Sequence, residues 1–189
     1  GCNARGVLQW VGAVLADLSR RQGWQPVQRT LGIVGVGHVG SLVRRYAEAW
    51  GFRVLCCDPP REERERCGFL PLGEVAREAD LITFHTPLDA TTRHLADAAL
   101  LARTKPRAVI INSSRGEVVD GEALKASGRE WVLDVWEHEP HIDRELLGKA
   151  LLATPHIAGY SEQGKATATA MSVATLAGFF GLPLRGWYP

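Results

Sequence analysis

Apolar residues near the start of the chain recur at the spacing of a helix. They are Val7, Trp10, Val11, Val14, Leu15 and Leu18, with polar residues between most of them. A spacing of three or four positions puts all of them on one face, so we predict an amphipathic helix over residues 5–21. Gly23 and Pro26 then break the pattern.

From Thr30 onward, short apolar runs alternate with helical stretches. The predicted strands cover residues 31–36, 53–57, 81–85, 108–112, 131–135 and 151–154, and the predicted helices cover 39–50, 72–78, 98–103, 121–127 and 144–147. Strands rich in Val, Ile and Leu without polar alternation are typical of a parallel sheet covered on both faces. The predicted fold class is therefore α/β, with a doubly wound, Rossmann-like parallel sheet.

A further helix is predicted over residues 162–180, with Ser161 as its N-cap and Gly181 and Pro183 after its end. We expect three parts: a helix and linker over 1–26, a nucleotide-binding domain over 27–160, and a return helix with a tail over 161–189. The charged run over 61–66 is interpreted as a solvated turn.

The composition excludes several classes of protein. The 189 residues include 22 Lys or Arg and 21 Asp or Glu, so the formal net charge is +1. Near-neutral charge argues against a nucleic-acid partner, and no apolar run reaches the ~18 residues that a membrane span needs. The four cysteines suggest no metal site and are expected to be buried, reduced thiols of a cytoplasmic protein; they are Cys2, Cys56, Cys57 and Cys67.

A glycine-rich loop follows the first predicted strand and precedes a helix. It reads Leu31-Gly-Ile-Val-Gly35-Val-Gly37-His-Val-Gly40 and has the G-x-G-x-x-G spacing. Gly35 would permit a tight turn, Gly37 would let the backbone approach a pyrophosphate, and Gly40 would let helix and strand pack closely. The helix start at His38 and Val39 would direct free N–H groups at the phosphates. In this context the motif predicts a dinucleotide-binding domain.

An acidic residue after the second predicted strand indicates which dinucleotide is bound. Asp58 lies 58 − 40 = 18 residues beyond Gly40, where its carboxylate would accept hydrogen bonds from ribose hydroxyls. The same charge would repel a 2′-phosphate, so we predict NAD rather than NADP. Arg61 could accommodate that phosphate, although it lies in the charged run. Thr86 follows the strand over 81–85 on the same sheet edge and is expected to contact the cofactor.

Three polar residues follow the later predicted strands. Arg115 could clamp a carboxylate through two parallel hydrogen bonds. His156 could take the proton of a hydroxyl group, and Glu139 could bond the other nitrogen of its ring. If the fold brings them together, they suit hydride chemistry at a 2-hydroxy acid. His85 and His94 are interpreted as structural, because no paired acid is apparent near either of them.

The chain resembles the D-isomer-specific 2-hydroxyacid dehydrogenases. The resemblance rests on Gly1-Cys-Asn-Ala4, Cys57-Asp-Pro-Pro-Arg61, Phe84-His-Thr-Pro-Leu88, Leu133-Asp-Val-Trp-Glu137 and Thr154-Pro-His-Ile-Ala-Gly-Tyr160, which span nearly the whole chain. It implies a catalytic triad of Arg115, Glu139 and His156, with His156 as proton donor and acceptor. It also implies that Asp134 holds the nicotinamide amide and that Tyr160 contacts substrate. The further cofactor contacts that it implies are Asp58, Thr86, Ser113, Ser114, Arg115 and Gly159.

The resemblance also implies what the chain lacks. In this family a preceding segment forms most of the substrate domain, and Gly1 is expected to lie where the interdomain helix begins. By this interpretation the chain binds NAD but turns over poorly, because closure by a second domain completes such sites. In one branch the substrate is a small phosphorylated hydroxy acid and a C-terminal region forms a homodimer. Arg5 and Lys165 are open candidates for the group that holds that phosphate.

Two alternatives stay open at this point. The substrate could instead be phosphoglycerate, hydroxypyruvate or glyoxylate. Alternatively, the chain could be a non-catalytic NAD-sensing protein of the corepressor kind, since an intact triad is compatible with both functions.

Overall fold

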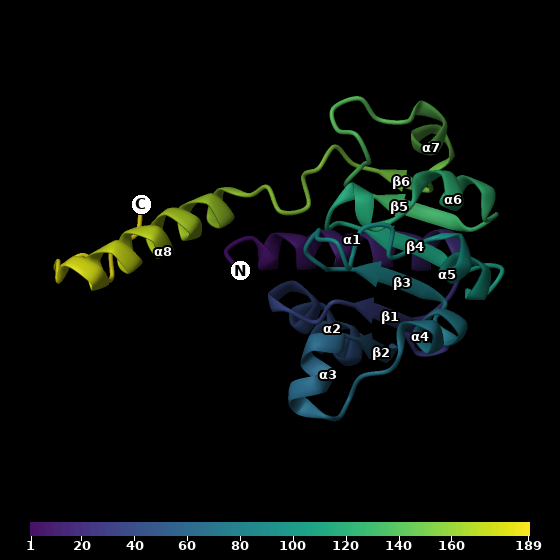
Figure 1. The fold of residues 1–189 in the computed structure, drawn as a ribbon, viewed down its shortest axis with the longest axis horizontal. Helices are drawn as coiled ribbons and strands as arrows, with labels where there is room; N and C mark the ends of the chain where they lie inside the picture. Colours follow the sequence, from purple (N-terminus) through teal and green to yellow (C-terminus); the bar gives the residue numbers. More distant parts are fainter.

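The computed structural model describes all 189 residues. Its core is one parallel sheet of six strands in the order β2-β1-β3-β4-β5-β6 (Figure 1). The strands are β1 (Thr30–Val34), β2 (Arg53–Cys57), β3 (Leu81–Phe84), β4 (Val109–Asn112), β5 (Glu130–Leu133) and β6 (Leu152–Ala153). The predicted fold class, a doubly wound parallel sheet with flanking helices, is confirmed.

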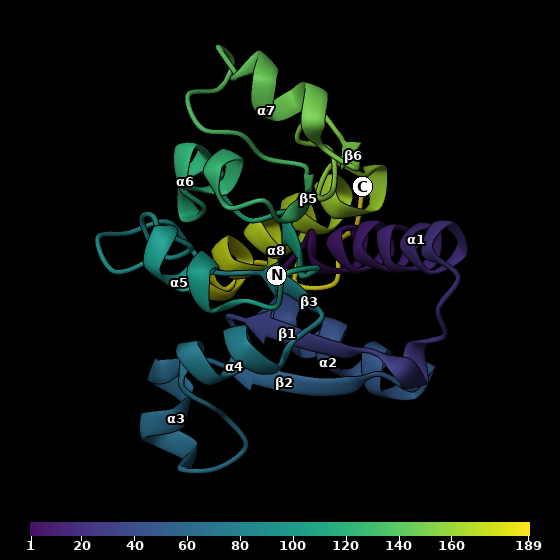
Figure 2. The ribbon, with the colours of Figure 1, turned by 90° about the vertical axis from the view of Figure 1, so that its right-hand side faces the viewer.

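Helices cover both faces of this sheet (Figure 2). On one face lie α1 (Ala4–Gln22) and α2 (His38–Trp50), and on the other lie α4 (Leu72–Glu78), α5 (Ala98–Arg103), α6 (Gly121–Ala126) and α7 (Arg144–Lys149). Two short 3-10 turns, Pro26–Gln28 and Gly116–Val118, and the peripheral α3 (Pro59–Glu65) complete this part of the chain.

The two-sided burial explains why the strands show no polar alternation. All five residues of β1 are buried. Ile33 packs in the cluster that includes α1 and α2, while its neighbour Val34 packs in the opposite cluster with α4 to α7. Successive side chains of a strand point to opposite faces, so both positions must be apolar when both faces are covered.

Four of the six predicted strands, β1, β3, β5 and β6, run one or two residues too far at their carboxyl ends, while the predicted ends of β2 and β4 match. Val36 and Val135 lie beyond β1 and β5, yet each is only 1% exposed. Their burial comes from the loops that leave the sheet, where strand pairing has already ended. Hydrophobicity therefore marks what is buried and does not mark where the hydrogen-bonded ladder stops.

Residues 62–66 are exposed, as the interpretation of this run requires, but the run belongs to a helix and not to a turn. Residues Pro59–Glu65 form α3, whose N-cap Asp58 accepts a hydrogen bond from the Arg61 N–H. The two prolines at the start of α3 suit a first helical turn, and Arg61 pairs with Glu65 one turn later. Local capping chemistry therefore outweighs the high charge of this run.

The cysteine prediction is only half right. Cys56 and Cys57 are buried on β2, and burial raises the pKa of Cys57 to about 11. Cys2 is half-buried, and Cys67 is exposed in the loop after α3.

The last helix, α8 (Glu162–Phe180), matches its predicted bounds and extends away from the sheet (Figure 1). The Ser161 side chain caps it by accepting the Gly164 N–H, as predicted. Within α8 only Gly164 and Ala177 are buried. No helix in the structure combines the length and apolar character that crossing a membrane requires.

Candidate functional site

The strand order creates a crevice where the loops after β1 and β3 diverge. The chain leaves β1 toward β2 on one side, and β3 pairs with β1 on the other. Such a switch point is where doubly wound sheets bind ligands. Gly35 turns the chain here with φ of 84°, and a Cβ at this residue would lie 2.8 Å from the backbone of His85. Only glycine fits this turn without strain.

The other two motif glycines differ in what surrounds them. A Cβ at Gly40 would overlap the carbonyl of Gly35, so Gly40 serves the packing of α2 on β1. A Cβ at Gly37 would meet no protein atom within 4 Å. No side chain caps α2, which begins at His38, so its first N–H groups face the open space beside Gly37. This space suits a pyrophosphate.

The carboxylate of Asp58 lies at the end of β2, beside the glycine loop. One oxygen accepts the Val36 N–H over 2.7 Å, and the other accepts the Arg61 N–H over 3.0 Å. Each carboxylate oxygen has a second lone pair, so these bonds orient the group and leave acceptor capacity for ribose hydroxyls.

Arg61 contributes to this corner and is not merely a solvated charge. Its Nη1 donates to the Val36 carbonyl over 2.7 Å and to the Ser41 hydroxyl over 3.2 Å. Its guanidinium also lies 5.1 Å from the centre of the Phe69 ring. The side chain therefore fastens the glycine loop to α3, a role that its place in a charged run did not indicate.

Two buried hydroxyl groups at this edge have no protein partner. Thr86 Oγ1 and Ser113 Oγ are both buried and make no hydrogen bond within the chain. Leaving a buried hydroxyl unsatisfied costs about 1–3 kcal/mol, so such groups call for an external partner. Both belong to the predicted cofactor contacts. Together with the open space at Gly37, they show that the residues present fit a bound dinucleotide.

Two cavities lie along this edge. One has a volume of about 430 Å³ and is lined by Gly35, Asp58, Thr86 and their neighbours. The second, about 250 Å³, brings together Asn3, Ser113, Arg115, Asp134, His156, Gly159 and Tyr160. A larger cavity of about 540 Å³ lies at the opposite edge and contains none of the predicted site residues.

Arg115 enters the second cavity from the loop after β4. Asn112 shapes this loop, because its amide donates to the Arg115 carbonyl and accepts from the backbone of Ser114. The Ser114 hydroxyl donates to the same Asn112 oxygen and keeps its acceptor lone pairs, and its contact with the cofactor stays a prediction. One guanidinium nitrogen donates to the Ser114 carbonyl over 2.6 Å. The remaining donors are free to bind a carboxylate.

Glu139 and His156 form a close pair. His156 Nδ1 lies 2.8 Å from one oxygen of Glu139, and the other oxygen accepts the Trp136 N–H over 2.8 Å. His156 has φ of 57°, in the left-handed region that non-glycine residues rarely adopt. Strain of this kind concentrates at functional sites. The pairing leaves Nε2 of His156 as the nitrogen available to a ligand.

Asp134 supports the loop that carries His156. Asp134 is only 1% exposed. Its carboxylate oxygens accept hydrogen bonds from Thr154 Oγ1 and from the backbone N–H groups of Ile157 and Ala158. The structure therefore adds a supporting role to the nicotinamide contact that the resemblance implies. A Cβ at Gly159 would lie 2.8 Å from the Asn3 amide, so the start of α1 packs against this loop.

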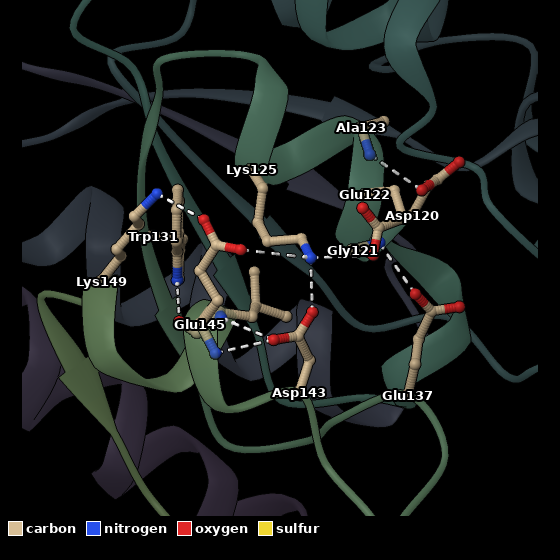
Figure 3. Close-up of polar contacts among 11 residues, drawn as sticks. Asp120, Gly121, Glu122, Ala123, Lys125, Trp131, Glu137, Asp143, Glu145 and Lys149 are labelled. Atoms are coloured by element: carbon tan, nitrogen blue, oxygen red, sulfur yellow. Dashed lines mark hydrogen bonds and ion pairs between the residues drawn. The ribbon is translucent and has the colours of Figure 1, made fainter.

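The acidic loop between β5 and α7 is fixed at further points (Figure 3). One Glu137 oxygen accepts the Gly121 N–H over 2.8 Å, and Asp143 caps α7 while it pairs with Lys125. The other Glu137 oxygen lies 2.7 Å from Nε2 of His94. His94 thus has an acidic partner distant in sequence, which corrects the expectation that it lacks one.

The sequence does not indicate two residues that shape the site, and it indicates a third, Lys165, only as a candidate for binding the substrate's phosphate. Asn3 lines the second cavity, the Trp136 backbone orients Glu139, and Lys165 Nζ lies 3.6 Å from the centre of the Tyr160 ring. Asn3 and Trp136 act through contacts that cannot be inferred from their residue types.

Comparison with known proteins gives a consistent picture. The family model for the D-isomer specific 2-hydroxyacid dehydrogenase, NAD binding domain, matches residues 8–158. An erythronate-4-phosphate dehydrogenase of Cronobacter sakazakii is 48% identical over 97% of this chain and 51% of its own length. One of Bacteroides fragilis is 48% identical over 95% of this chain and 55% of its own length. The chain thus spans about half the length of the curated relatives it matches.

A solved structure shares the fold. The D-lactate dehydrogenase of Aquifex aeolicus, complexed with NAD and lactic acid, superposes with a TM-score of 0.74 at 24% identity. The match covers 94% of this chain and 67% of that one.

Proposed function

The chain belongs to the D-isomer specific 2-hydroxyacid dehydrogenase family, and on this premise we propose that the full-length protein oxidises a phosphorylated 2-hydroxy acid with NAD. The proposed reaction converts 4-phospho-D-erythronate to 3-hydroxy-2-oxo-4-phosphooxybutanoate, a step of vitamin B6 biosynthesis. The relatives named erythronate-4-phosphate dehydrogenases support this substrate. The cavity that holds Arg115 and His156 supports the reaction type.

The observation that carries the proposal is the Glu139–His156 pair in a cavity with Arg115. Arg115 would hold the substrate carboxylate through its free guanidinium donors. His156 Nε2 would take the proton of the C2 hydroxyl as the C2–H bond breaks. Glu139 would keep Nδ1 occupied and stabilise the imidazolium that forms, which is the usual task of a carboxylate behind a catalytic histidine.

The chain's own groups would also hold the cofactor. The glycine loop and the first turn of α2 would bind its pyrophosphate, Asp58 its adenosine ribose, and Thr86 and Ser113 would gain the partners that they lack. NAD supplies the acceptor for the hydride that leaves C2. The negative charge of Asp58 favours NAD over NADP.

A substrate panel with the full-length protein tests this proposal. We expect the highest kcat/KM with NAD and 4-phospho-D-erythronate, measured by the absorbance of reduced cofactor. A higher value with phosphoglycerate, hydroxypyruvate or glyoxylate would assign a different substrate within the family. If no hydroxy acid is oxidised but a partner protein binds in an NAD-dependent manner, the corepressor-like function holds instead.

We further propose that the full-length protein is a cytoplasmic homodimer. Exposed aromatic side chains on α8 and the tail support an interface; they are Phe179, Phe180, Trp187 and Tyr188. The buried free thiols of Cys56 and Cys57 support a reducing compartment. Light scattering after size exclusion should give twice the monomer mass, and cell fractionation should recover the protein with the cytosol.

A further inference from the structure

One lysine beside the second cavity differs from the other lysines of the chain. Lys105 pairs with Asp80, Lys125 pairs with Asp143 and Glu122, and Lys149 pairs with Glu145. Figure 3 shows Lys125 and Lys149 in such contacts. Lys165, in the first turn of α8, is exposed and has no carboxylate within 4 Å. Its ammonium group is therefore available to an anionic ligand.

Lys165 is held next to a residue that lines the cavity. Its Nζ lies 3.6 Å from the centre of the Tyr160 ring, and Tyr160 shares the cavity wall with Arg115 and His156. Both backbones are fixed locally. The Tyr160 N–H donates to the Ile157 carbonyl, and the Lys165 N–H donates to the Ser161 carbonyl. The cation is thus positioned before any ligand arrives.

The charges of the cavity leave one part of a phosphorylated substrate unmatched. Arg115 is the only Lys or Arg among the residues that line it, and Asp134 adds a negative charge. If Arg115 holds the carboxylate of a four-carbon acid and His156 faces its C2 hydroxyl, the phosphate at C4 extends beyond them. A phosphate dianion needs a positive partner and hydrogen-bond donors there.

We propose that Lys165 and Tyr160 form the subsite for the substrate's phosphate group and that Lys165 sets the preference for phosphorylated 2-hydroxy acids. This inference rests on the proposed function. The Lys165 ammonium supplies the charge, and the Tyr160 hydroxyl supplies a donor. The adjacent cation lowers the pKa of the Tyr160 hydroxyl, which makes it a stronger donor to a phosphate oxygen.

Arg5 is the competing candidate. It lies in the first turn of α1, is exposed and has no carboxylate partner within 4 Å. Unlike Lys165, it makes no hydrogen bond or cation–π contact with a residue of the cavity. The geometry therefore favours Lys165. The Arg5→Gln variant tests the alternative that Arg5 binds the phosphate.

Titration of the 189-residue chain with inorganic phosphate tests the subsite without activity. The readout is the NMR signal of the Tyr160 ring protons, assigned through Tyr160→Phe. We expect a saturable shift in the wild type and in Lys149→Gln, a retained shift in Lys165→Arg, and none in Lys165→Gln. A shift that persists in Lys165→Gln, or one that disappears in Arg5→Gln, would overturn the proposal.

Kinetics of the full-length protein test the preference. Lys165→Gln should lower kcat/KM for 4-phospho-D-erythronate by about 10- to 100-fold, with little change for D-erythronate or in the KM for NAD. Lys165→Arg should restore much of the loss. Equal losses with both acids would contradict a phosphate subsite. A wild type that oxidises neither acid would refute the proposed function, while the phosphate titration would still report on Lys165.

Discussion

His156 Nδ1 lies 2.8 Å from Glu139 Oε2, and the second oxygen of the same carboxylate accepts the Trp136 N–H over 2.8 Å. The two residues come from different loops, 17 positions apart. Because the backbone holds the carboxylate on its far side, the carboxylate can in turn orient the imidazole. This makes His156 Nε2 the atom on which the proposed proton transfer depends.

Replacing His156 should abolish most turnover of the full-length protein without affecting cofactor binding. We expect His156→Asn to lower kcat by about 10²- to 10⁴-fold, the usual contribution of a general base. Steady-state assays measure kcat, and fluorescence titration should give a Kd for NAD within about twofold of wild type. His141→Asn, an exposed histidine in the nearby loop, is the matched control. Normal turnover in His156→Asn would show that the proton goes elsewhere.

The glycine loop offers a pair of variants that separate binding from folding. Gly37→Val should keep the melting temperature near wild type, since a Cβ there meets no protein atom within 4 Å. It should weaken NAD binding at least tenfold, because the side chain would occupy the space for the pyrophosphate. Gly40→Ala should instead destabilise the protein by about 2 kcal/mol or more, since its Cβ overlaps the Gly35 carbonyl. Equal melting temperatures for the two variants would contradict this division.

Asp58 should decide between NAD and NADP. Asp58→Ser can still cap α3 but loses the negative charge, so we expect NAD affinity to fall by about tenfold and NADP affinity to rise. The gain for NADP should depend on Arg61, which lies beside the same loop. Calorimetric titration of Asp58→Ser with and without Arg61→Gln measures both effects. Unchanged affinities for both cofactors would exclude Asp58 from the ribose site.

Asp134 should be as important for stability as for binding. In Asp134→Asn one carboxylate oxygen becomes an NH2 group, which cannot accept a hydrogen bond. At least one of the groups that donate to this carboxylate, such as the N–H of Ile157 or Ala158, therefore loses its acceptor. We expect a loss of about 2–4 kcal/mol in the free energy of unfolding, measured by urea denaturation. Asp143→Asn, at a partly exposed helix cap, should cost only about 1 kcal/mol. A smaller loss for Asp134→Asn than for Asp143→Asn would be inconsistent with its burial.

His85 should make stability depend on pH in the acidic range. Burial lowers the pKa of His85 to about 4, whereas its unfolded value is about 6.5. Between these values the unfolded chain binds a proton that the folded chain does not, so stability falls as the pH drops from 6.5 toward 4. His85 is only partly buried, so solvent screening weakens the effect. We expect the resulting loss in the free energy of unfolding to reach about 2 kcal/mol. Urea denaturation across this range should show a smaller slope in His85→Gln, and an unchanged slope would contradict the assignment.

Much of the fold could be predicted from local patterns. The period of α1, the apolar runs of the sheet and the caps of α3 and α8 depend on neighbours in the chain. This is why the bounds of β2, α4, α5 and α8 match the prediction and those of the other predicted elements differ by one or two residues. The charged run over 61–66 forms a helix because the cap at Asp58 stabilises the first turn despite the high charge. The partners of His94 could not be inferred, since Glu137 is 43 residues away.

Local sequence is enough to specify the alternation of strands and helices, the glycine spacing and the kinds of polar group that follow each strand. Those features follow from backbone preferences and side-chain chemistry within a few residues. The three-dimensional arrangement is needed to bring Arg115, Glu139 and His156 together. It also leaves the hydroxyl groups of Thr86 and Ser113 without partners and places the Lys165 ammonium against the Tyr160 ring. Parallel strands bring their carboxyl ends to one edge of the sheet, but the contacts made at that edge depend on the tertiary contacts that hold each loop in place.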